Sequence, residues 1–127
     1  MLAVCQEFEM EMENDAIPRI AFGFAGGIGN TGDVCGAVVG AVMAIGLKLG
    51  RADTMEEALR RLAVPREFRR RFEAEMGTIN CRELTGVDLT AEKAIEQLMN
   101  SDISQKVCFP AVGAAYRLLV ELLKETT

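Results

Sequence analysis

The residues of this chain best suited to chemistry are its four cysteines, Cys5, Cys35, Cys81 and Cys108. A deprotonated thiol is both a nucleophile and a ligand for soft metals. No two of the cysteines form a C-x-x-C pair, so the short spacing of a zinc ribbon or a thioredoxin-like redox site is absent. The sequence therefore predicts one redox or metal centre whose thiols are brought together by the fold.

Histidine is absent from the 127 residues. This excludes Ser-His and Cys-His dyads, H-E-x-x-H zinc sites and the C-x-x-C-H motif that attaches haem c. Any general base must be a carboxylate, a lysine, a tyrosine or a thiolate, and a soft-metal site must rest mainly on sulfur.

Three of the cysteines fall where helices are expected to begin. Cys35 lies in the first turn of an apolar helix, and Cys81 directly follows the capping residue Asn80. Cys108 precedes Pro110 by two positions. The positive end of a helix dipole lowers the pKa of a thiol, so we expect thiolates at these three positions.

Packing is the competing interpretation for every cysteine, because free cysteine is among the most buried residue types. For Cys5, which lies on the apolar face within an expected helix, packing is the favoured interpretation. For Cys35, Cys81 and Cys108 the two interpretations stay open.

Glycines gather in the segment 23–32, which contains five of them. Gly27 and Gly29 belong to a literal G-x-G-x-x-G pattern, but no convincing strand precedes it and no parallel sheet follows, so NAD is not expected. We interpret the segment as a glycine-rich loop over the site. Gly36 and Gly40 lie four residues apart on one face of the next helix, where a neighbouring helix or a cofactor can approach the backbone.

The elements that must position these residues are helices, because no segment shows a convincing run of strand-like alternation. The expected fold is all-α: one domain, residues 1–127, folded as a bundle of about six to seven helices around a buried Gly/Ala/Val-rich central helix. Thr31 or Asp33 can cap the central helix, which Gly50 ends, and Asp53 or Thr54 can begin the next one. Gly77 can end the helix after that. Asn80 and Glu83 have the order of a capping box and open a short helix that Gly86 ends. The main helices are expected at about 1–13, 16–22, 33–49, 53–62, 65–76, 90–99 and 110–123. The last of them begins near Pro110, or about a turn earlier with a kink there.

Composition excludes several classes of partner. Fourteen basic and nineteen acidic residues give a net charge of −5, and no basic run lies beside aromatic residues, so nucleic acid is not an expected partner. The longest apolar stretch, 34–47, is shorter than the roughly 20 residues that span a bilayer, so membrane insertion is not expected. Acidic residues appear by Glu7, unlike in a signal peptide, and we expect a cytoplasmic protein with free thiols. The apolar helices make a homodimer plausible.

Four stretches in order resemble a known family. They are F-x-F-A-G-G-I-G at 22–29, C-G-A-V-V-G at 35–40, G-T-I-N-C-R-E-L at 77–84 and the late Cys108. The chain resembles a four-cysteine redox-active family named for a cysteine, a C-G-A-x-x-G motif and two later cysteines. The resemblance covers almost the whole chain.

The resemblance implies a helical domain whose cysteines act together, with a redox role assigned by inference and an association with transporter genes. A similar domain occurs in split-Soret cytochromes, where its cysteines are implicated in an iron–sulfur cluster. Cys35, Cys81 and Cys108 match the second to fourth family cysteines. The first has no match, because its position falls before Met1, so a four-thiolate cluster needs Cys5, another ligand or residues beyond this sequence.

Three functions therefore remain open. The first is an iron–sulfur or other soft-metal protein with Cys35, Cys81 and Cys108 as ligands and a redox or transporter-associated protein as partner. The second is an oxidoreductase in which two of these thiols alternate between dithiol and disulfide. The third is a helical scaffold or partner-binding module whose cysteines only pack.

Overall fold

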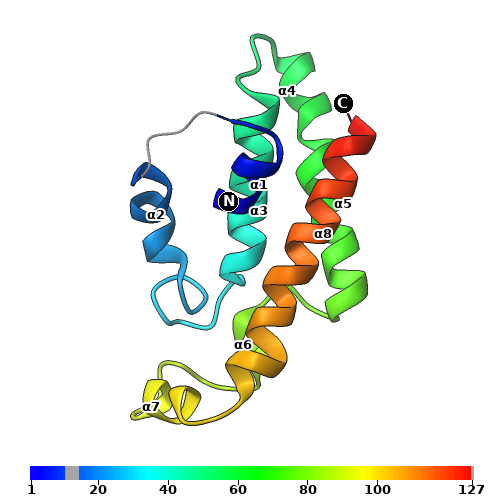
Figure 1. Cartoon of the computed structure of the whole chain (residues 1–127). Helices are drawn as coiled ribbons and strands as arrows, with labels where there is room; N and C mark the ends of the chain where they lie inside the picture. Colours follow the sequence, from blue (N-terminus) through cyan, green and yellow to red (C-terminus); the bar gives the residue numbers. More distant parts are fainter. Residues whose placement is uncertain (11–14, 127) are drawn as a thin grey trace.

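A computed structural model of the chain describes residues 1–10 and 15–126. Within these residues the fold is all-α, as the sequence predicts, and its only β feature is one isolated bridge. Figure 1 shows the helices in chain order. They are α1 (Leu2–Glu7), α2 (Ala16–Ala21), α3 (Gly36–Leu49), α4 (Met55–Arg61), α5 (Ala63–Met76), α6 (Cys81–Thr85), α7 (Ala94–Met99) and α8 (Phe109–Thr126), with a 3₁₀ turn η1 (Phe22–Phe24) and a π-helical turn η2 (Ser104–Cys108).

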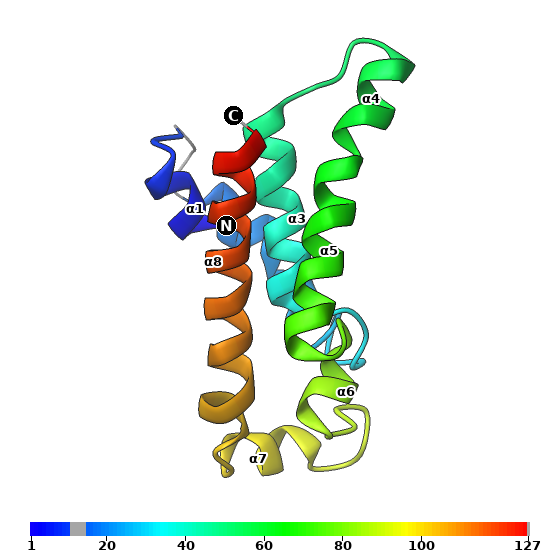
Figure 2. The same cartoon turned by 90° about the vertical axis from the view of Figure 1, so that its right-hand side faces the viewer.

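Three long helices, α3, α5 and α8, lie side by side and form the framework (Figure 2). Their apolar faces meet around Phe68 and Phe72, two of the largest side chains that are fully buried. Burial of such side chains is the main stabilising contribution in a chain of this size. Gly77 ends α5 and Gly50 ends α3, both with the left-handed backbone that favours glycine.

The helix α3 is less buried than we expected. We expected the apolar helix that became α3 to be the most buried, yet α8 contributes more buried residues than α3 does. On α3, Val42 and Leu47 are instead exposed, at 38% each. Its many glycines and alanines make it apolar without giving it large side chains to bury.

Several helix boundaries differ from the predicted ones. The first helix ends at Glu7, and Glu9 takes a left-handed conformation, whereas we expected it to continue to about residue 13; residues 11–14 lie outside the described part. Helix α7 begins at Ala94 and not near Thr90, because Lys93 is also left-handed. Apolar periodicity therefore overestimated both helices, since it does not detect local turns.

The capping predictions also need correction. Cys35, not Asp33 or Thr31, is the N-cap of α3. Asn80 is the N-cap of α6, but its side chain makes no capping bond to the backbone; its amide nitrogen donates to Glu83 Oε1 at 3.2 Å. The cap predicted at Thr54 is correct, because its hydroxyl accepts a hydrogen bond from Glu57 N at 3.1 Å.

In the described part of the chain, none of the helices has both the length and the apolar character needed to cross a bilayer.

Candidate functional site: a cavity with three thiols

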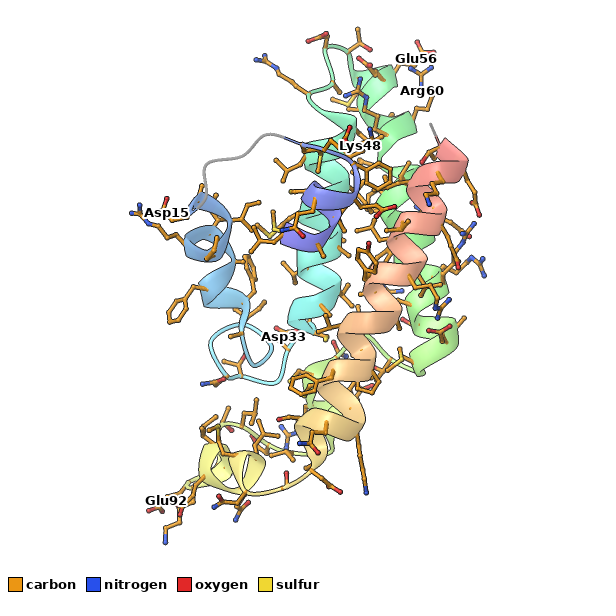
Figure 3. All side chains as sticks on the ribbon, in the orientation of Figure 1. Asp15, Asp33, Lys48, Glu56, Arg60 and Glu92 are labelled. Carbon is orange, nitrogen blue, oxygen red and sulfur yellow. The ribbon has the colours of Figure 1, made fainter. Side chains whose placement is uncertain are left out.

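Cys35 and Cys81 are brought together by a short antiparallel contact between two loops. Val34 and Asn80 form the bridge, and two backbone bonds flank it. Cys35 N donates to Ile79 O at 2.7 Å, and Cys81 N donates to Asp33 O at 2.8 Å. In such a ladder alternate residues share a face, so the two cysteines are diagonal neighbours on the same side of the bridge. Figure 3 labels Asp33 at this point, between the glycine-rich loop and α3.

The glycine-rich loop folds into a left-handed turn. Five consecutive residues have φ between 61° and 70°: Gly26, Gly27, Ile28, Gly29 and Asn30. The turn is closed by backbone bonds, among them Gly29 N to Gly23 O at 2.9 Å and Asp33 N to Gly27 O at 2.9 Å. A β-branched residue such as Ile28 pays about 1–2 kcal/mol for this conformation, so the surrounding bonds must hold it.

Gly27 is required by close packing as well as by its backbone. A Cβ at this position would lie 2.6 Å from Asp33 N and O and 2.8 Å from the Cβ of Cys81. Gly36 is nearly as crowded, because an added Cβ would lie 3.2 Å from Phe24 O. The glycines therefore let the loop lie directly against the two cysteine-bearing segments.

Cys108 is the last residue of the π-helical turn η2, which continues directly into α8. Of the two expected starts of the last helix, the structure has the earlier one, because η2 runs into α8 without a break before Pro110. The segments α6 and η2 contact each other, which places Cys108 on the side of Cys81. The π-helical turn is a feature often found at functional sites.

The three cysteines line one cavity of about 330 Å³. Its wall contains Gly26, Gly27 and Gly36, and most of the rest is aliphatic, from α6, α7, η2 and α8 and the segment after α6. The polar side chains that share the lining are Asn30 and Thr85, and no charged side chain takes part. The site is therefore a small apolar cavity whose reactive groups are sulfur atoms.

For Cys81 and Cys108 the pKa shifts are opposite to the expected lowering. Burial raises the pKa of Cys81, and the nearby charges of Cys35 and Cys108 raise it further. Burial also raises the pKa of Cys108, with Cys35 as the second cause. The expected stabilisation by helix dipoles is weak here because α6 has only five residues and Cys108 lies inside a continuous helix. Cys35 is thus close enough to both other thiols for its charge to contribute to their raised pKa values.

The remaining predicted site residues lie elsewhere. Cys5 is buried in α1, which packs on α8 away from α6, and it is not among the residues that line the cavity (Figure 1). Gly29 faces open space, and Gly40 lies beside Met1. The structure thus groups Cys35, Cys81 and Cys108 with Gly27 and Gly36, and leaves Cys5, Gly29 and Gly40 outside this group.

The two polar residues of the lining, Asn30 and Thr85, were not singled out by the sequence. Asn30 is left-handed within the turn, and asparagine tolerates this conformation better than most residues, so its place directly after Gly29 was a usable signal. Thr85 Oγ1 donates to Cys81 O at 2.8 Å and ends the short helix that carries the cysteine. No pattern in the sequence marked Thr85.

The cavity thiols are the type of ligand that soft metals prefer, but there are fewer of them than the usual sites need. Sulfur ligands select copper(I), zinc and iron–sulfur clusters. Over residues 1–10 and 15–126, however, no three cysteine or carboxylate side chains are arranged as a metal-binding group. The cavity also offers three thiols where the usual clusters take four.

A protein-family model described as "Putative redox-active protein (C_GCAxxG_C_C)" matches residues 1–122. The motif in this description places glycine before cysteine, whereas the chain has Cys35 before Gly36; Ala37 and Gly40 follow in the same order in both. No curated protein and no solved structure matches the chain.

Proposed function

The chain belongs to the C_GCAxxG_C_C family, and from this premise we propose that it is a thiol-based redox protein in which two of the three cavity cysteines alternate between dithiol and disulfide. The observation that carries the proposal is the convergence of Cys35, Cys81 and Cys108 on one uncharged cavity. These residues come from three segments that are distant in sequence, and packing alone does not require their thiols to share a cavity.

The raised pKa values of Cys81 and Cys108 favour a reduced form that carries its protons. Oxidation of two thiols breaks two S–H bonds, forms one S–S bond and releases two electrons and two protons to an acceptor. Cys35 is the natural partner in either pairing, since its charge acts on both other thiols.

Closing the disulfide requires a small movement. Diagonal neighbours across an antiparallel pair have Cα atoms about 7–8 Å apart, whereas a disulfide needs about 4.4–6.8 Å. A Cys35–Cys81 bond would therefore pull the glycine-rich loop and the start of α6 together. Strained disulfides are the reducible ones, which suits a redox exchange better than a structural link.

A soft metal or an iron–sulfur cluster held by the same three thiolates is the second candidate, and the sulfur-only donor set favours it. Copper or an iron–sulfur cluster bound there would supply one-electron transfer, and the aliphatic wall would exclude water from it. A fourth ligand would have to come from outside the cavity, because Cys5 does not line it.

Anaerobic purification followed by iron, sulfide and zinc analysis separates the two candidates. For the metal-free protein, thiols are then counted before and after equilibration with oxidised glutathione. The dithiol proposal predicts that two thiols per chain disappear in the wild-type protein and that no pair disappears when Cys35 is replaced by serine. The matched control is Cys5→Ala, which should still lose the pair. An unchanged thiol count in the wild-type protein would contradict the proposal, and stoichiometric iron and sulfide would favour the second candidate.

A further inference from the structure

A second cavity, of about 490 Å³, lies between α1, α2, α3 and α8. Its size is within the range of about 300–1,000 Å³ that is typical of small-molecule sites. The small residues Gly40, Ala41 and Ala115 form part of its floor, where larger side chains would fill the space. A further apolar cavity of about 320 Å³ also contacts Pro18, Ala21 and Gly40, so a longer molecule has room along α2.

The lining chemistry restricts the occupant. No charged side chain lines the larger cavity and most of its lining is apolar, which favours an uncharged, mainly apolar occupant. The amino group of Met1 also lies beside the cavity, 4.0 Å from the place of a Cβ on Gly40, and is a further donor. Tyr116 is the one lining residue with a side-chain hydroxyl. This hydroxyl donates to Glu7 Oε2 across 3.5 Å, a long bond that a ligand carbonyl could replace.

The cavity adjoins the thiol site. Gly36, Ala37 and Val112 line both cavities, and Gly36 follows Cys35 directly in the chain. Cys35 lines the thiol cavity but not the larger one, so an occupant of the larger cavity would lie across these shared residues from the thiol.

We infer that the larger cavity binds a quinone, which accepts the electrons of the thiol centre. This inference rests on the proposed dithiol function and adds its substrate class. Two cavity thiols lose two protons and two electrons and form one S–S bond. The quinone takes up both electrons and both protons, and its two carbonyl groups become hydroxyl groups. An uncharged ring with carbonyl oxygens matches an apolar cavity with one hydroxyl donor.

Duroquinone is the appropriate probe, because every ring position carries a methyl group and the ring cannot alkylate thiols. Under anaerobic conditions the reduced protein should convert one duroquinone to its hydroquinone for each pair of thiols lost. Binding alone is measured by calorimetry with a variant in which Cys35, Cys81 and Cys108 are all serine, and this variant should bind duroquinone as the wild type does.

Gly40→Leu places a side chain in the cavity, and only the Met1 side chain and backbone nitrogen lie within 4 Å of its Cβ. It should weaken binding by about tenfold or more. The control Gly46→Leu adds the same side chain on α3 at an exposed position with nothing within 4 Å, and it should bind as the wild type does. Urea unfolding of both variants shows whether they fold.

Equal binding by Gly40→Leu and Gly46→Leu, or no binding by any form, would overturn the quinone site. If oxidised glutathione removes two thiols but duroquinone is neither bound nor reduced, the quinone inference fails and the dithiol function stands. If duroquinone binds in the Gly40-dependent manner but no oxidant removes thiols, the dithiol function fails and with it the role of the quinone as acceptor.

Discussion

The bundle of α3, α5 and α8 and the thiol end of the molecule are stabilised in different ways. In the bundle, regular helices bury Phe68 and Phe72 between their apolar faces. At the thiol end, a left-handed turn, an isolated bridge and a five-residue helix surround a cavity. The bundle therefore depends on side-chain packing, and the site depends on backbone conformations that glycine permits. Substitutions in the two regions should have separable effects.

The largest effect is expected in the bundle. Phe68→Ala removes a fully buried ring and should lower the free energy of unfolding by about 3–5 kcal/mol. Urea unfolding followed by circular dichroism measures this loss. Phe22 is 81% exposed, so Phe22→Ala is the matched control and should change stability by less than about 0.5 kcal/mol. Equal losses in both variants would show that the assigned core is wrong.

At the thiol end, backbone substitutions should have the next largest effect. Gly27→Ala combines a left-handed backbone with contacts of 2.6 Å to Asp33, and it should cost roughly 2–4 kcal/mol and expose Cys81 to alkylation. Gly29→Ala has the same backbone demand but meets nothing within 4 Å, and should cost only about 1 kcal/mol. If the two variants were equally stable, the close contact between the turn and Cys81 would be refuted.

A glycine at position 28 should relieve the strain in the left-handed turn. Ile28 has φ 62° and is partly exposed, so Ile28→Gly relieves strain while losing little buried surface. We expect stability to rise by roughly 1 kcal/mol, because relief of the left-handed penalty exceeds the entropy that glycine gains when unfolded. A loss of stability in thermal unfolding would mean that Ile28 makes contacts that outweigh the strain.

The smallest effect concerns the charge coupling among the thiols. Cys35→Ser removes a negative charge that raises the pKa of both Cys81 and Cys108, so alkylation of these two should reach half its maximum at lower pH. Cys5→Ala should leave both pH profiles unchanged. The raised pKa values also predict that stability falls as the pH rises above the ordinary thiol value, because the unfolded thiols lose their protons first. Coincident alkylation profiles for Cys35→Ser and wild type would contradict the coupling.

The two regions also differ in how far they could be predicted. The apolar spacing on α5 and α8 and the glycines Gly50 and Gly77 gave correct helices and ends, because packing and left-handed caps leave local signals. The grouping of Cys35 with Cys81 depends on a bridge between Val34 and Asn80, which are far apart in the chain, and no local pattern reveals it.

The raised thiol pKa values were also beyond sequence reasoning. A lowered thiol pKa was predicted from the helix dipole, and this requires only that the cysteine lie at a helix start. The effects of burial and of neighbouring charges on the pKa depend on the tertiary structure. The position of Cys108 within a continuous helix removed the basis of the prediction at that residue.

The central claim is that Cys35, Cys81 and Cys108 form one redox centre from which Cys5 is separate. Mass-spectrometric mapping of the metal-free protein after equilibration with oxidised glutathione tests it most directly. The account predicts one intramolecular disulfide whose two cysteines both belong to the cavity, with Cys5 recovered as a free thiol. A disulfide that includes Cys5, or four free thiols at every glutathione ratio, would contradict it.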